Sequence, residues 1–140
     1  MPQLPDVKIL VVDDEADMRE LVRMTLGLQG AIVQTTASAT EALQTIIEFK
    51  PDVVISDIAM PDVDGYQFVQ QLRRLCTNQP LPTIALTTYA SELDQQHATL
   101  AVSAEQREAG FDRHLSKPIK PEELVETVAA LIASAKQRSR

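Results

Sequence analysis

The chain has 140 residues, 44% of them hydrophobic, and a formal net charge of −7 at pH 7, which fits one globular domain and argues against nucleic-acid or membrane binding through clustered Lys and Arg. Its single cysteine, Cys76, cannot form an internal disulfide, and its N-terminus has neither the basic start nor the apolar core of an export signal. These two features lead us to expect a protein of the reducing cytoplasm, and since no stretch approaches the ~18 apolar residues of a membrane-spanning helix, we expect it to be soluble.

Short runs rich in Val, Ile and Thr, the residues that suit β-strands, recur along the chain. They occupy residues 7–12, 31–36, 52–56 and 82–87. A weaker fifth strand is expected near residues 113–116, mainly from its place in the alternation. The first, third and fourth runs are apolar on both sides, as strands covered on both faces require.

Helix-length segments separate these runs. Residues 16–30 carry apolar side chains at helical spacing and reach Gly30, a residue that suits a C-terminal cap. Residues 38–49 open with a capping box formed by Ser38 and Glu41. The third and last helices are expected at residues 66–75 and 121–135, and a fourth, with poorly defined ends, within the polar, Ala-rich segment 91–110.

Alternating strands and helices predict right-handed crossovers and a parallel sheet covered on both faces. The fold class is α/β, with five strands and five helices. We assign residues 1–135 to one domain and residues 136–140 to a basic tail or the start of a linker.

Polar side chains stand where the predicted strands end, which is where open parallel sheets bind ligands. Asp13 and Asp14 follow the first strand, Asp57 the third, Thr87 the fourth and Lys117 the fifth. With a strand order of 2-1-3-4-5, the three carboxylates converge in one crevice. Like charges held this close need a cation, and oxygen ligands without His or Cys suit Mg²⁺ or Mn²⁺.

Such a set of groups describes an aspartate that accepts a phosphoryl group, since acid, metal, hydroxyl and ammonium supply the charge neutralisation that the transfer needs. Each residue also has a simpler interpretation. Asp57 alone could turn the chain at a strand end, and Asp13 and Asp14 could cap a helix. Asp62 and Asp64 are interpreted as turn residues.

Four segments carry a family resemblance: ILVVDDE, PDVVISDIAMPDVDGYQF, IALTTYA and GFDRHLSKPI. In this order and spacing the chain resembles the CheY-like receiver domain of two-component response regulators over nearly its whole length, and the last two segments resemble receivers attached to hybrid histidine kinases. The resemblance implies a flavodoxin-like three-layer sandwich. It also implies a phosphoryl group taken from a histidine kinase or a phosphotransfer protein, with the receiver catalysing both the transfer and its later hydrolysis.

The resemblance assigns a role to each site residue. It makes Asp57 the phosphorylated residue and a metal ligand, Asp14 a direct metal ligand and Asp13 a ligand through water. The main-chain carbonyl of Ala59 is the remaining protein ligand of the metal. Thr87 matches the switch hydroxyl that moves toward the phosphoryl group.

The same resemblance implies that Lys117 contacts the phosphoryl group and that the bond between Lys117 and Pro118 is cis. His114 stands where the family often has Tyr or Phe as a switch ring. The family's partner surface, and a possible homodimer contact, is the face formed by the fourth helix, fifth strand and fifth helix.

Two departures from the family pattern stand out. The chain between Thr87 and Gly110 is roughly eight residues longer than usual, an insertion size that collects in surface loops or helix ends. Ala59 and Tyr89, two residues after Asp57 and Thr87, offer no acid or amide to orient water, which predicts slow hydrolysis of the phosphoryl group.

Two further function classes stay open at this point. One is a metal-dependent phosphohydrolase with an aspartyl-phosphate intermediate, although such enzymes have Asp-x-Asp after the first strand. The other is a receiver-like binding module that works without phosphorylation, although all five residues of the expected site are present.

Overall fold

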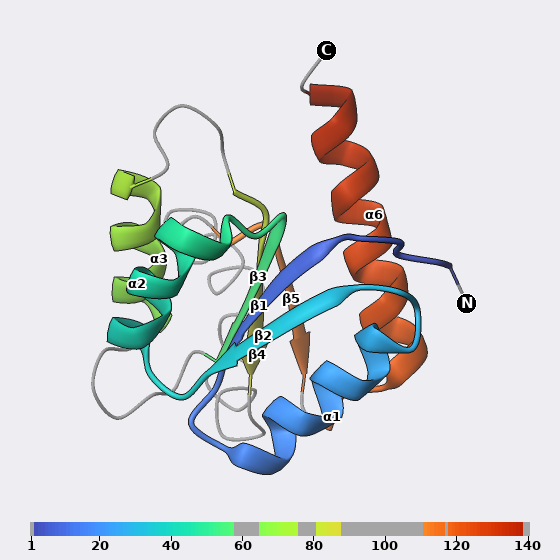
Figure 1. The fold of residues 1–140 in the computed structure, drawn as a ribbon, viewed down its shortest axis with the longest axis horizontal. Helices are drawn as coiled ribbons and strands as arrows, with labels where there is room; N and C mark the ends of the chain where they lie inside the picture. Colours follow the sequence, from blue (N-terminus) through green and yellow to red (C-terminus); the bar gives the residue numbers. More distant parts are fainter. Residues whose placement is uncertain (1, 58–64, 76–80, 88–110, 117, 139–140) are drawn as a thin grey trace, which may run out of the picture.

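A five-stranded parallel sheet with helices on both faces forms the centre of the molecule (Figure 1). The computed structural model describes residues 2–57, 65–75, 81–87, 111–116 and 118–138. The strand order is β2-β1-β3-β4-β5, as predicted. The strands are β1 (Lys8–Val12), β2 (Ile32–Thr36), β3 (Val53–Asp57), β4 (Thr83–Thr87) and β5 (Arg113–Ser116).

In the described part of the chain, two helices cover each face of the sheet, which gives the three-layer arrangement expected of a flavodoxin-like fold. The described helices are α1 (Ala16–Gly27), α2 (Ala39–Phe49), α3 (Gly65–Leu75) and α6 (Pro121–Arg138). Side chains of α1 and α6 pack on one face of the sheet, and side chains of α2 and α3 on the other. The central strand β3 is buried along its whole length because it is covered on both faces.

The start of α2 is formed as its sequence predicts, whereas the end of α1 is not. The Ser38 side chain accepts a hydrogen bond from the Glu41 N–H at 3.2 Å. The predicted extension of α1 to Gly30 is wrong, because this helix ends at Gly27 with Leu28 as its cap. Gly30 instead adopts a φ of 97° in the turn that leads into β2, a conformation that glycine adopts readily.

Other predicted features fall partly or wholly beyond the described residues. Four helices are described where five were predicted, since the segment 91–110 expected to hold the fourth lies outside them. Helix α6 continues to Arg138, past the predicted start of the tail at residue 136, and the division at that point stays a prediction. In the described part of the chain, no helix is long and apolar enough to cross a membrane.

At the amino edge of the sheet, two aspartates join neighbouring strands in the same way. Asp52, just before β3, accepts a hydrogen bond from the Lys8 N–H at 2.9 Å and donates its own N–H to the Lys8 carbonyl at 2.7 Å. Asp112, just before β5, does the same with Thr83, at 2.9 and 3.0 Å. Each carboxylate thus caps the first N–H of the adjacent strand.

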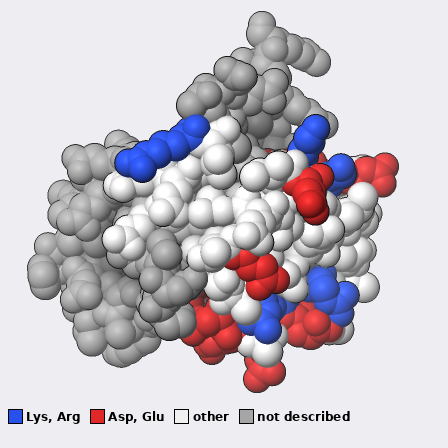
Figure 2. Space-filling model, turned by 60° about the vertical axis from the view of Figure 1, so that its left-hand side comes forward, with Lys and Arg blue, Asp and Glu red and all other residues white. Residues whose placement is uncertain are grey.

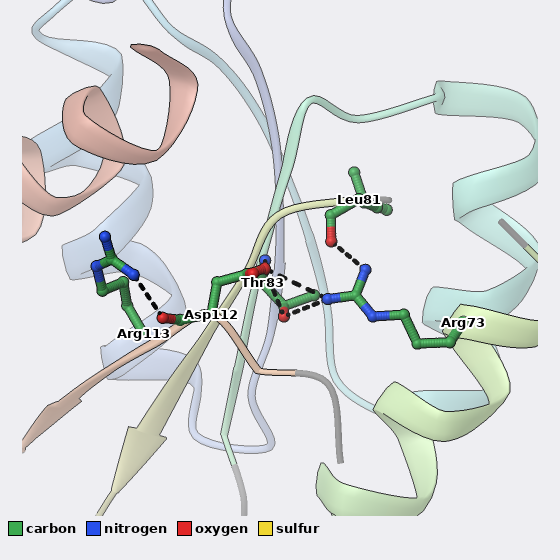
Figure 3. Close-up of polar contacts among 5 residues, drawn as sticks. All are labelled: Arg73, Leu81, Thr83, Asp112 and Arg113. Atoms are coloured by element: carbon green, nitrogen blue, oxygen red, sulfur yellow. Dashed lines mark hydrogen bonds and ion pairs between the residues drawn. The ribbon is translucent and has the colours of Figure 1, made fainter. Parts of the chain in front are cut away.

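Arg73 of α3 strengthens the second of these contacts (Figure 3). Its guanidinium donates to the Asp112 carboxylate at 3.3 Å, to the Thr83 hydroxyl at 3.1 Å and to the Leu81 carbonyl at 2.5 Å. One cation therefore links the end of α3 to the starts of β4 and β5.

Candidate functional site

Three carboxylates meet at the opposite edge of the sheet, where the parallel strands end. Asp13 directly follows β1, Asp14 comes next, and Asp57 is the last residue of β3. One oxygen of each carboxylate lies within 4.8 Å of the other two. The adjacent places of β1 and β3 in the sheet bring these acids together although they are far apart in the chain.

The three acids differ in their access to solvent. Asp13 and Asp57 are buried, with 0% and 2% of their surfaces exposed, whereas Asp14 is exposed. Figure 2 shows Asp and Glu side chains mixed with Lys and Arg at the lower end of the molecule, the end toward which the strands run in Figure 1. The cluster is therefore built from two buried carboxylates and one carboxylate at the surface.

Hydrogen bonds to β2, to α1 and to the link between β1 and α1 fix Asp13. Its N–H donates to the Thr36 carbonyl at the end of β2, at 3.1 Å, and its Oδ1 accepts from the Glu15 N–H at 2.9 Å. Its carbonyl accepts from the Arg19 guanidinium of α1 at 2.8 Å. The buried Thr36 hydroxyl donates to the Val11 carbonyl at 3.3 Å, which joins the ends of β1 and β2.

The main-chain carbonyl of Asp57 is also hydrogen-bonded, by the side chain of Ser56. The Ser56 side chain is 1% exposed, and its hydroxyl donates to the Asp57 carbonyl at 3.0 Å. Arg19, Thr36 and Ser56 were not singled out from the sequence, because each contact depends on the fold or on a local geometry that no motif describes.

The remaining predicted site residues are only partly within the described residues. The main chain of Thr87 ends β4, beside Ser116 of β5. His114 lies on β5 opposite Ala85 and is exposed. Pro118 is exposed, while Lys117 lies outside the described residues.

Ala59, the predicted source of a main-chain metal ligand, also lies outside the described residues, as do Asp62, Asp64, Cys76 and Tyr89. Their assigned roles stay predictions. The described core of the site therefore consists of the three carboxylates and the groups that hold them.

The donor set fits a small divalent cation. Three carboxylates with oxygens within 4.8 Å of one another repel when ionised, and a cation among them removes this cost. Carboxylate oxygens are hard ligands of the kind that Mg²⁺ and Mn²⁺ prefer. Asp13, Asp14 and Asp57 thus present the chemistry that such an ion requires.

Comparison with known protein families matches residues 9–129 to the response regulator receiver domain. This match covers most of the chain and includes all three carboxylates.

Individual relatives agree with this match. The chain is 41% identical over 128 residues to an uncharacterized 14.6 kDa protein of Leptolyngbya boryana, covering 91% of this chain and 92% of that protein. It is 40% identical over 128 residues to the response regulator Rre1 of Synechocystis, covering 91% of this chain but only 52% of Rre1. The chain thus spans about half the length of Rre1.

Among solved structures, the chemotaxis protein CheY4 of Vibrio cholerae superposes with a TM-score of 0.77 at 33% sequence identity, covering 90% of this chain and 98% of CheY4.

Proposed function

The chain belongs to the response regulator receiver domain family and acts as a receiver in two-component signalling, and we propose that Asp57 is the residue that accepts the phosphoryl group. One observation carries the assignment. Asp57 is the carboxylate that ends the fully buried central strand β3, within 4.8 Å of the carboxylates of Asp13 and Asp14. The sheet therefore fixes its position beside Asp13, which follows the neighbouring strand β1.

In this proposal, Asp14 and Asp57 hold a Mg²⁺ or Mn²⁺ ion directly, Asp13 holds it through water, and the Ala59 carbonyl completes the protein's share. When bound, the ion neutralises negative charge on the transferring phosphoryl group. The burial of Asp13 and its hydrogen bond from the Glu15 N–H support a fixed orientation for that carboxylate.

The reaction is an in-line displacement at phosphorus. An Asp57 oxygen forms the new O–P bond while the P–N bond of a phosphohistidine donor breaks, and the leaving imidazole nitrogen keeps the bonding electron pair. We assign Lys117 to contact a phosphoryl oxygen and Thr87 to move toward the product, with His114 following as the switch ring. Leu86, the residue before Thr87, pairs with Asp57 across β4 and β3. This proximity supports the role of Thr87.

The proposed donor is a histidine kinase or a histidine phosphotransfer protein, in the cytoplasm. A homodimer through the face that includes β5 stays part of the proposal, and so does the expectation that the chain itself binds no nucleic acid. The match covers only 52% of Rre1, so the proposal concerns the receiver and not an output activity of a longer protein.

The comparisons favour the receiver over the two other classes. Neither a metal-dependent phosphohydrolase nor a binding module that works without phosphorylation is supported by the family match over residues 9–129. The adjacent placement of Asp13 and Asp14, with the third carboxylate on β3, also differs from the Asp-x-Asp that the hydrolase class has after its first strand.

The test is intact-protein mass spectrometry after incubation with acetyl phosphate and Mg²⁺. The wild type is expected to gain one phosphoryl group, and Asp57→Asn to gain none. Glu48→Gln, which removes an exposed carboxylate on α2, is the matched control and should behave like the wild type. An adduct on Asp57→Asn, or none on the wild type, contradicts the assignment.

A further inference from the structure

Arg19 occupies a place that helix energetics disfavour. It lies in the first turn of α1, where the helix dipole disfavours a positive charge. Within the described part of the chain it forms no ion pair with a carboxylate, in contrast to Arg23 on the same helix, which pairs with Glu20. The position of Arg19 therefore needs another explanation.

The contact that Arg19 makes is to the main chain of the acidic cluster. Its guanidinium nitrogen Nη1 donates to the carbonyl oxygen of Asp13 at 2.8 Å. That carbonyl belongs to the peptide group between Asp13 and Asp14. A bond to this oxygen limits rotation of the peptide plane, and with it the direction in which the Asp14 side chain leaves the backbone.

The exposed member of the cluster is the one that gains most from such a constraint. Asp13 is held by the Thr36 carbonyl through its N–H and by the Glu15 N–H through Oδ1. Asp57 ends a buried strand. Asp14 is exposed and lies in the link between β1 and α1, so its direction depends on the peptide group that Arg19 holds.

We infer that Arg19 is a positioning residue for the divalent cation site, holding the peptide between Asp13 and Asp14 so that the Asp14 carboxylate meets those of Asp13 and Asp57. This inference rests on the proposed function, since it assumes that the three carboxylates bind a cation. It extends that function to a residue that never touches the cation or the phosphoryl group.

Charge repulsion and ligand orientation predict opposite changes in cation affinity when Arg19 is removed. A positive side chain near a cation site weakens cation binding through repulsion, so removing it should strengthen binding. Removing a group that orients a ligand should weaken binding, typically by 10–100-fold for partners of metal ligands. The direction of the change therefore separates the two effects.

The experiment measures the affinity of the full-length, metal-free chain for Mn²⁺ by isothermal titration calorimetry, without a phosphodonor. Arg19→Met keeps the apolar stem but removes the donors and the charge. Arg23→Met removes the same charge from the same helix and is the matched control. Arg19→Lys, which keeps the charge and one donor group, tests rescue.

We expect Arg19→Met to bind Mn²⁺ about tenfold more weakly, at the lower end for groups that orient metal ligands, Arg19→Lys to recover most of the loss, and Arg23→Met to match the wild type. Amide exchange of Glu15 in the metal-free chain should also be faster in Arg19→Met than in Arg23→Met. Unchanged or tighter Mn²⁺ binding by Arg19→Met, or equal weakening by Arg23→Met, overturns the inference. Arg19→Leu, which also lacks the donors and the charge, replaces Arg19→Met if circular dichroism shows that the latter is unfolded.

The phosphoryl adduct, measured on the same wild-type preparation, keeps the two proposals separate. An adduct on the wild type together with unchanged Mn²⁺ affinity in Arg19→Met overturns the role of Arg19 alone. The absence of an adduct, with Mn²⁺ binding weakened as expected, overturns the phosphoacceptor assignment alone. A wild type that binds no Mn²⁺ overturns the role of Arg19 and the proposed cation site together.

Discussion

Aspartates stand at both edges of the sheet, but their surroundings differ. At the amino edge, Asp52 and Asp112 each accept a hydrogen bond from the first N–H of a neighbouring strand, and Asp112 also accepts one from Arg73. At the carboxyl edge, Asp13, Asp14 and Asp57 bring their oxygens within 4.8 Å of one another. The first arrangement pairs negative charge with donors, and the second collects negative charge in one place.

Free energy separates these two uses of the same side chain. A carboxylate at a strand start accepts a hydrogen bond from a main-chain N–H that would otherwise lack an acceptor within the protein, and so stabilises the fold. Carboxylates gathered together repel one another and lower stability until a cation binds. We therefore assign the amino edge to the fold and the carboxyl edge to the chemistry, and four predictions test this division.

The largest effect is expected from Asp57→Asn at the carboxyl edge. Phosphorylation should be lost completely, while the free energy of unfolding in the absence of divalent cations should rise by about 1 kcal/mol, because one member of the like-charged cluster becomes neutral. Urea denaturation in the presence of a chelator measures this change. A fall in stability would show that the Asp57 charge supports the fold and would contradict the assignment of the carboxyl edge to the chemistry.

Removal of the divalent cation is expected to have the next largest effect. Saturating Mg²⁺ should stabilise the wild type by about 2.7 kcal/mol at a concentration 100-fold above the dissociation constant. A chelator should reverse this gain, and Asp14→Asn should reduce it strongly because it removes a direct ligand. Thermal unfolding with and without Mg²⁺ measures both. Equal gains in the wild type and Asp14→Asn would contradict the assignment of Asp14 as a ligand.

At the amino edge, Asp112→Ala should lower the free energy of unfolding by about 2 kcal/mol, because the Thr83 N–H and the Arg73 guanidinium lose their shared acceptor. The Arg73 and Asp112 side chains are 27% and 25% exposed, so solvent compensates only part of the loss. Phosphorylation by acetyl phosphate should persist under conditions where the variant is folded.

Asp52→Ala is the matched control for this change, since it breaks the same main-chain contact without an arginine partner. It should lower the free energy of unfolding by about 1 kcal/mol, the contribution of one exposed hydrogen bond. A larger loss from Asp52→Ala than from Asp112→Ala would show that the Arg73 contacts do not strengthen the amino edge.

The smallest effect is expected on α1, away from both edges. The guanidinium of Arg23 donates two hydrogen bonds to the Glu20 carboxylate, which lowers the pKa of Glu20 and raises that of Arg23. A lowered folded-state pKa stabilises the chain above the ordinary glutamate pKa, and this contribution fades as the pH falls through the lowered value. Both groups are exposed, so the contribution is slight.

Glu20→Gln should therefore be slightly less stable than the wild type at neutral pH, with a difference that shrinks in acid. Parallel urea titrations across the acid range measure it, and a difference that grows in acid would contradict the sign. Neither Mn²⁺ affinity nor phosphorylation should change.

Much of the fold followed from local patterns in the sequence. The β-branched runs predicted the strands, and the Ser38 capping box predicted the start of α2. The end of α1 was placed too late, because a glycine after a helix can serve either as its cap or in the following turn. Gly30 serves the turn, and the difference depends on the main-chain contacts between residues 4–6 and 29–30.

The candidate acids can be identified from the chain alone, since Asp13, Asp14 and Asp57 follow recognisable apolar strands and the parallel alternation places strand ends at one edge. The way these acids are held depends on the packed molecule. The hydrogen bonds of Asp13 to Thr36 and Arg19 join separate elements, and the link between Arg73, Thr83 and Asp112 joins α3 to the amino edge. Such contacts leave no periodic pattern in the chain, because they depend on distances that exist only after the sheet and its helices have packed.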